Sequence, residues 1–147
     1  MRKIENAQKE LCEYLISIMP VEWKKICFYS KCTSGSRTTW IALVEKETGA
    51  ICTQESFWDR YNEYPCKKMD VYIKLGKLIK NLYNAYIEKF GEEKIWYTYS
   101  LTIEDDYSFH VDLGSQMPEG NLVEQHDKVF RDFFNEEYQY LEGKYPY

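Results

Sequence analysis

The sequence holds few of the side chains that carry catalysis or bind metal ions. Its 147 residues include only two histidines, His110 and His126. The five cysteines form no CxxC pair and no Cys–His cluster of the kind that binds zinc. Neither an HExxH pattern nor a calcium-binding loop occurs. The sequence therefore predicts no metal site and no cofactor.

Phosphate-binding loops are missing as well. The one hydroxyl-rich turn that contains a glycine, residues 33–36, lacks the second glycine and the Lys-Ser or Lys-Thr of a P-loop. No local signature supports a Cys–His nucleophilic pair. Carboxylate pairs of the glycosidase kind stay open, because any two of the 24 acidic residues could meet. We expect no catalytic residue and no enzymatic activity.

Long apolar runs are also absent. No stretch approaches the roughly 18 apolar residues of a membrane span. The chain begins Met-Arg-Lys and continues as an amphipathic stretch, without the apolar segment of a secretory signal. The odd number of cysteines, most of them within apolar patterns, is typical of reduced thiols. These features predict a cytoplasmic protein with no membrane contact.

What the sequence does contain is an excess of acid at its C-terminal end. Residues 102–147 carry eleven Asp or Glu against three Lys or Arg, a net charge of −8, whereas residues 1–101 carry a net charge of +3. A field of this sign attracts basic proteins and repels the phosphates of nucleic acids. We therefore expect a basic protein partner and no direct contact with nucleic acid. The alternative is an acidic surface that only aids solubility.

Two groups of residues are candidates for the binding surface. The first group is acidic and is densest in a predicted hairpin turn; its members are Glu104, Asp105, Asp106, Asp112, Glu119, Glu124 and Asp127. The second group, Trp58 and Tyr61, lies in an aromatic segment without clear periodicity, residues 55–68. Aromatic side chains are frequent at protein interfaces.

Hydrophobic periodicity predicts the secondary structure. Apolar residues three and four positions apart predict helices over residues 4–18, 70–90 and 122–134, with Pro20 ending the first and Asp70 and Gly91 bounding the second. Alternation predicts strands over residues 25–31, 38–44, 50–54, 95–103 and 108–113. The order α-β-β-β-α-β-β-α predicts one α+β domain over residues 1–147, in which three helices pack on an antiparallel sheet made of a three-strand meander and a hairpin.

The apolar side of each predicted element also supplies the expected core. The large side chains expected to be buried are Trp23, Phe28, Trp40, Leu75, Leu82, Trp96, Leu101 and Phe109.

Three segments of the chain resemble the YezG-like immunity proteins, which are bacterial antitoxins paired with secreted or contact-delivered polymorphic toxins. They are the N-terminal helix running into residues 18–29, the tyrosine-rich helix of residues 70–90, and residues 96–103 followed by an acidic turn and residues 109–112. The resemblance implies a small cytoplasmic α+β protein that neutralises a cognate toxin, often a nuclease, by direct binding. An interaction or scaffold module without a toxin partner is the alternative, and the sequence does not fix the oligomeric state.

Overall fold

The computed structural model describes residues 2–32, 37–53, 61 and 66–134. Its helices are α1 (Arg2–Ser17), α3 (Lys68–Phe90) and α4 (Leu122–Phe133), with a short 3₁₀ turn, η1 (Glu92–Lys94). Its strands are β1 (Trp23–Cys32), β2 (Arg37–Glu45), β3 (Ile51–Thr53), β4 (Thr98–Glu104) and β5 (Phe109–Gly114). The predicted α+β class and the predicted order of elements are confirmed.

All strand pairs are antiparallel, and the sheet has the order β3-β2-β1-β4-β5. The meander β1-β2-β3 and the hairpin β4-β5 meet where β4 pairs with β1, for example at Phe28 and Leu101. This central pairing joins two units that α3 separates in the sequence. β5 and β3 are the two edges of the sheet.

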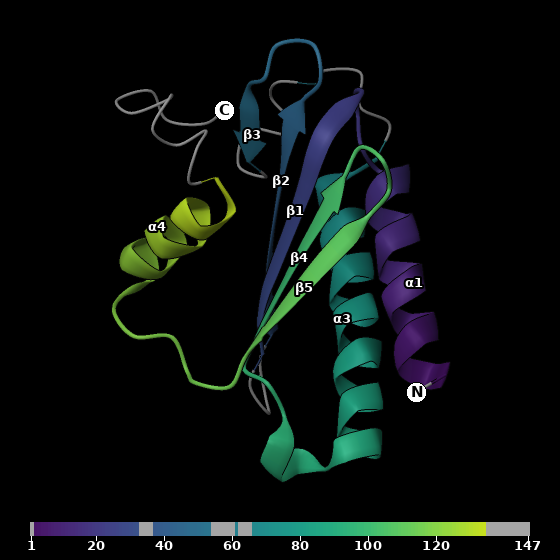
Figure 1. The fold of residues 1–147 in the computed structure, drawn as a ribbon, viewed down its shortest axis with the longest axis vertical. Coiled ribbons are helices and arrows are strands. Elements are labelled where there is room, and N and C mark those ends of the chain that lie inside the picture. Colours follow the sequence, from purple (N-terminus) through teal and green to yellow (C-terminus); the bar gives the residue numbers. More distant parts are fainter. Residues whose placement is uncertain (1, 33–36, 54–60, 62–65, 135–147) are drawn as a thin grey trace.

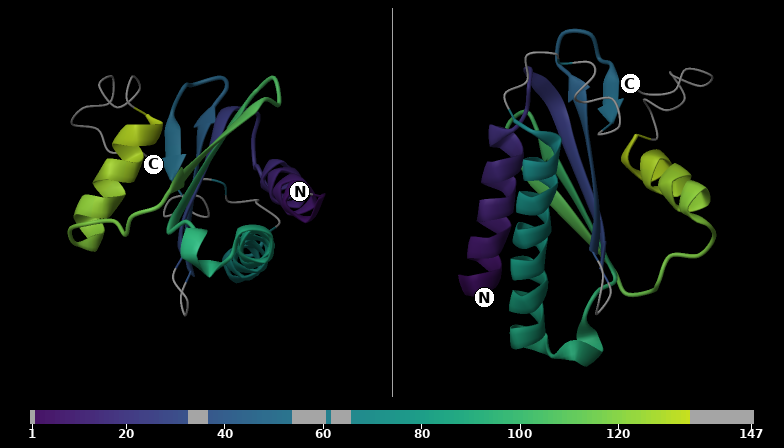
Figure 2. Two further views of the ribbon diagram at one scale, coloured as in Figure 1. Left: turned by 60° about the horizontal axis from the view of Figure 1, so that its bottom comes forward. Right: turned by 180° about the vertical axis from the view of Figure 1, so that it is seen from behind.

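The molecule has three layers (Figures 1 and 2). α1 and α3 lie side by side on one face of the sheet, and α4 lies on the other face. Between the sheet and the two long helices is the larger core, which includes Phe28, Leu43, Leu82 and Leu101, each fully buried. The hydroxyl of Tyr99 on β4 donates a hydrogen bond to Oε1 of Gln8 on α1, so the buried phenol is not left without a partner.

A smaller core lies between α4 and the first three strands. Phe130, Phe133 and Phe134 pack against apolar side chains from β1, β2 and β3: Cys27, Trp40, Ala42, Val44 and Ile51. Phe133 stacks on Trp40 with ring centroids 5.9 Å apart. The α4 helix therefore covers the β3-β2-β1 half of this face of the sheet.

The structure corrects two details of the sequence prediction. α3 begins at Lys68, and Asp70 lies in its first turn instead of capping it. Phe109 is 55% exposed, although Ile103 directly opposite it on β4 is buried. The layer of helices thus does not cover Phe109, although Val111 further along β5 is partly buried against the large core. The alternation that placed Phe109 on the helix side could not show where that layer stops.

The remaining core predictions are confirmed with one qualification. Phe28, Trp40, Leu75, Leu82, Trp96 and Leu101 are buried, whereas Trp23 is only partly buried. The end of α3 at Gly91 is also confirmed. Gly91 has a φ of +85° and its N–H donates to the carbonyl oxygen of Ile87, a conformation that favours glycine.

Candidate protein-binding surface

The half of the sheet that α4 leaves uncovered is polar. Alternate residues of β4 and β5 face the α4 side there, and they are Thr98, Ser100, Thr102, Glu104, His110 and Asp112. Their neighbours in sequence, such as Leu101 and Ile103, enter the large core on the opposite face. One face of the β4–β5 pair thus contributes side chains to the large core, and its other face forms an open polar surface.

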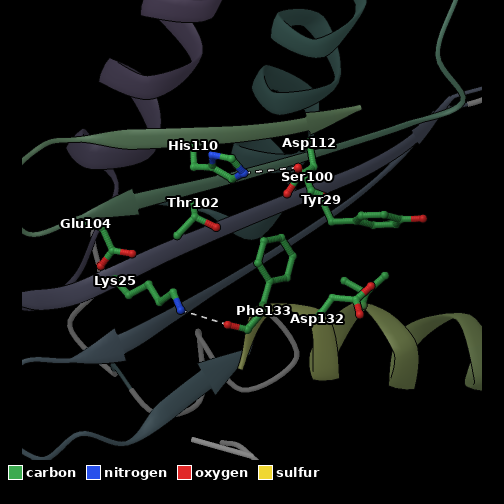
Figure 3. Close-up of a pocket in the computed structure, with 10 residues that line it drawn as sticks. Lys25, Tyr29, Ser100, Thr102, Glu104, His110, Asp112, Asp132 and Phe133 are labelled. Atoms are coloured by element: carbon green, nitrogen blue, oxygen red, sulfur yellow. Dashed lines mark hydrogen bonds and ion pairs between the residues drawn. The ribbon is translucent and has the colours of Figure 1, made fainter. Parts of the chain in front are cut away.

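A cleft runs between this polar half-sheet and the side of α4 (Figure 3). One part has a volume of about 520 Å³ and is lined from β1, β4, β5 and α4, with Tyr29 and Asp132 among its walls. The cleft continues into a second part of about 690 Å³, which extends along residues 114–119. Burial raises the pKa of the Tyr29 hydroxyl, so this group remains protonated at neutral pH and can donate a hydrogen bond.

Carboxylates outnumber the available cations in the first part of the cleft. Lys25 lies directly opposite Glu104 on β4, but its ammonium donates to the carbonyl oxygen of Phe133 at 2.9 Å. Asp132 is paired with Lys128 at 2.9 Å, one helical turn earlier. Within the described residues, Glu104 has no ion pair. The cleft therefore presents a negative charge that the ion pairs among the described residues do not neutralise.

His110 and Asp112 form the only side-chain hydrogen bond between β5 residues that face the cleft, within the part of the chain that the structure describes. His110 Nε2 lies 3.2 Å from Asp112 Oδ1, and both side chains are exposed. No hydrogen bond links His110 to Ser100 or Thr102 among the described residues, so the geometry does not provide a hydroxyl nucleophile held by a base. Three or more metal-binding side chains do not cluster anywhere in the described ranges.

The acidic turn between β4 and β5 continues the negative surface beyond the cleft. Glu104, Asp105 and Asp106 are all exposed, and Asp105 has no ion pair among the described residues. Asp106 has a structural role in the turn, because its Oδ1 accepts two hydrogen bonds from Ser108. The backbone N–H of Ser108 donates at 2.9 Å and the Ser108 hydroxyl at 2.5 Å. These bonds lower the pKa of the Asp106 carboxyl.

The other predicted acidic residues are dispersed along the approach to α4. Glu119 is exposed and lines the second part of the cleft. Glu124 is exposed, but it takes part in the cap of α4, because its N–H donates to Asn121 Oδ1 and its Oε1 accepts from Asn121 Nδ2. The side chain of Asp127 lies outside the described part of the structure. The structure thus brings Glu104, Asp112 and Glu119 onto one surface.

Of the two aromatic candidates, only Tyr61 is described, and it does not line this cleft. Trp58 lies outside the described residues. Tyr61 is partly buried against the large core, and its hydroxyl donates to Oε2 of Glu45 at 2.5 Å. Burial and this hydrogen bond raise the pKa of Tyr61. These contacts link Tyr61 itself to Glu45 at the end of β2.

The sequence analysis missed most of the neutral and basic residues of the cleft. Lys25, Tyr29, Ser100 and Thr102 line it, together with Asp132. The alternation of hydroxyl and apolar residues in Thr98–Glu104 was a usable signal, because a half-exposed strand is expected to place its polar side chains on an open face. That pattern could not predict the position of α4, which forms the second wall of the cleft.

Comparisons with known proteins define the family. The family model described as "Immunity protein YezG-like" matches residues 4–142, which is most of the chain. The chain therefore belongs to the YezG-like immunity protein family. A comparison with curated proteins gave no match. In the described residues, no helix has both the length and the apolar character needed to cross a membrane.

Proposed function

We propose that this chain protects the cell that makes it by binding a cognate toxin directly. Membership of an immunity protein family implies an antitoxin role. In this proposal the toxin is secreted or delivered by contact, and the two proteins meet in the cytoplasm. Inhibition by direct binding is supported by the open acidic surface, in which Glu104 and Asp105 have no ion pair among the described residues.

The proposed partner is a basic nuclease domain. A protein that binds nucleic acid must present cationic side chains to phosphates. The carboxylates of Glu104, Asp105 and Asp112 offer such side chains an alternative set of negative charges, without the bases and sugars of a substrate. Complementary charge of this kind speeds the encounter of two proteins and favours the correct partner. The cleft beside α4 gives a concave place for one or two projecting Lys or Arg side chains.

Co-purification with the product of the adjacent gene tests the proposal. The two proteins are produced together, with an affinity tag on this chain, and the toxin domain is recovered as a stable complex. Adding the purified chain to the isolated toxin domain is expected to abolish toxin activity in a titration that saturates at a fixed ratio. The chain alone is expected to show no nuclease or hydrolase activity. Toxin activity that persists in excess of the chain contradicts the proposal.

A second candidate function is a non-enzymatic interaction module without a toxin partner. The observation that favours it is the exposed apolar group of Tyr107, Phe109 and Leu113. In that case the adjacent gene product neither binds the chain nor harms cells that lack it. Growth of cells that express the adjacent gene alone separates the two candidates.

A further inference from the structure

The outer edge of β5 pairs with no other strand among the described residues. Natural sheets commonly shield their edge strands with proline, lysine or a bulge. β5 contains neither proline nor lysine, and its pairing with β4 runs without a register shift from Thr98 opposite Gly114 to Ile103 opposite Phe109. Phe109 and Leu113 are 55% and 45% exposed. The strand therefore combines exposed apolar side chains with an edge whose backbone no described residue pairs with.

The hairpin geometry shows which backbone groups of β5 point outward. The N–H of Glu104 donates to the carbonyl oxygen of Ser108 at 2.9 Å, so these two residues form a hydrogen-bonded pair. Such pairs alternate along an antiparallel ladder. The even-numbered residues of β5 therefore bond to β4, and Phe109, Val111 and Leu113 direct their N–H and C=O groups away from the sheet. No other described residue forms a backbone hydrogen bond with these groups.

We propose that two copies of this chain associate by pairing their β5 strands antiparallel about a two-fold axis at Val111. In this register Val111 faces the partner's Val111, and Phe109 faces the partner's Leu113. His110 then lies opposite the partner's Asp112, and by symmetry the same pair forms a second time. The sequence of the strand is thus complementary to itself, which a closed two-fold interface requires.

The two faces of the paired strands are matched in polarity. Phe109, Val111 and Leu113 lie on the helix side of the sheet, where Val111 already packs against the large core. In the dimer they extend this apolar surface from one copy to the other. These residues also occupy the hydrogen-bonded positions, so each exchanges both backbone bonds with its opposite residue.

Charge supports the same register. His110 and Asp112 occupy the positions without backbone bonds, where opposite side chains lie closest. Each histidine then lies between its own Asp112, at 3.2 Å, and the partner's Asp112. Extending the register past the ends of β5 sets the acidic turn of residues 104–106 beside the partner's residues 116–118, which are uncharged. The two acidic turns therefore do not oppose one another.

The first test removes one outward N–H group. Sedimentation velocity of the wild-type chain over a range of concentrations is expected to show a reversible dimer. Val111→Pro lacks the outward donor but keeps every hydrogen bond to β4, a position where an edge strand tolerates proline. This variant is expected to be monomeric. Val111→Thr keeps the N–H and the β-branched shape, and it is the matched control that is expected to remain a dimer.

The second test reverses the charge pattern without altering the backbone. His110→Asp places aspartate opposite the partner's Asp112 at two symmetric positions, and the dimer dissociation constant is expected to rise about tenfold. The double exchange His110→Asp with Asp112→His restores opposite charges across the axis and is expected to recover the dimer. Circular dichroism spectra equal to that of the wild type verify the fold of each variant.

Three results would overturn the proposal. They are a wild-type chain that stays monomeric at its highest soluble concentration, a Val111→Pro variant that remains dimeric, and a double exchange that fails to recover what His110→Asp has lost. A wild-type monomer whose capture of the toxin is abolished by Val111→Pro would assign the β5 edge to a strand of the toxin instead.

Discussion

The ammonium of Lys25 on β1 donates a hydrogen bond to the carbonyl oxygen of Phe133 at 2.9 Å and lies 5.8 Å from the centre of the Phe134 ring. The last carbonyl groups of a helix carry partial negative charge and lack intrahelical donors. Lys25 satisfies one of them and fixes the end of α4 to the sheet. Lys31, six residues along the same strand, bonds to Gln125 near the start of the helix. The two lysines therefore hold α4 in position over β1.

Replacing Lys25 with methionine is expected to loosen α4. The variant keeps an apolar stem but loses the hydrogen bond and the contact with the Phe134 ring, at a cost of about 1–2 kcal/mol in the free energy of unfolding. Urea unfolding measures the change, and amide hydrogen exchange is expected to rise in residues 130–134. Lys24→Met is the matched control, because Lys24 is exposed and has no described partner. Equal effects from the two variants would contradict the assigned role.

Truncating Leu82 to alanine is expected to cost about 2–5 kcal/mol, because the cavity would open in the large core where α3 packs on the sheet. Leu82 is fully buried. Asn81→Ala is the neighbouring control on the exposed face of the same helix, and it is expected to change the free energy of unfolding by less than about 0.5 kcal/mol. Thermal or chemical unfolding provides the measurement, and a near-neutral Leu82→Ala would show that the helix packs differently.

The hairpin turn is expected to loosen in acid. The pKa of Asp106 is lowered by its hydrogen bonds from Ser108, so the folded state favours the carboxylate. The resulting stabilisation is present above the ordinary carboxyl pKa and is lost as the pH falls through the lower pKa of the folded state. NMR titration of the Ser108 amide is expected to report this transition. Asp106→Asn keeps an oxygen acceptor but removes the titration, and a persistent transition in that variant would assign it to another group.

Reversing charge on the acidic surface is expected to slow toxin binding. Glu104→Lys combined with Asp105→Lys removes carboxylates that have no described ion pair, whereas Asp106 is left in place because it holds the turn. The association rate constant is expected to fall, and its dependence on salt to weaken, because electrostatic steering is lost. Stopped-flow mixing at two ionic strengths measures both.

The matched control for that experiment is Glu93→Lys. Glu93 is exposed in η1, at the end of β4 away from the acidic turn. Its reversal changes the net charge by the same amount per site but leaves the hairpin intact. An equal slowing by Glu93→Lys would mean that overall charge, and not the surface around Glu104, governs the encounter. An unchanged rate in the double variant would move the interface elsewhere.

The local patterns of the sequence were sufficient for the elements and for most of the core. Alternation located each strand, and helical spacing placed Leu75 and Leu82 on the buried face of α3. The long-range arrangement was not readable in this way. Periodicity assigned Phe109 to the correct side of the sheet, but its exposure depends on how far α1 and α3 extend over that side.

The candidate site was only partly predictable for the same reason. Clustered charge in the sequence made Glu104, Asp105 and Asp112 candidates, and all three are exposed on the β4–β5 hairpin. The cleft itself depends on β1, β4, β5 and α4 meeting in space, and the contact that sets its second wall joins Lys25 to Phe133, 108 residues apart. Local sequence does not indicate that Lys25 donates to a carbonyl oxygen at the end of α4. It therefore also does not indicate that Lys25 leaves Glu104, directly opposite on β4, without an ion pair among the described residues.

The alternation of β4 has a consequence for how such a protein can change its partner. Ser100 and Thr102 face the open cleft, while Tyr99, Leu101 and Ile103, which intervene along the strand, are buried on the other side. Replacing a cleft residue therefore alters the proposed recognition surface while the packing that holds the fold is retained. When the partner's surface changes during evolution, such a chain can adapt by substituting every second residue of one hairpin. These substitutions leave the buried residues between them unchanged, so they cost little stability.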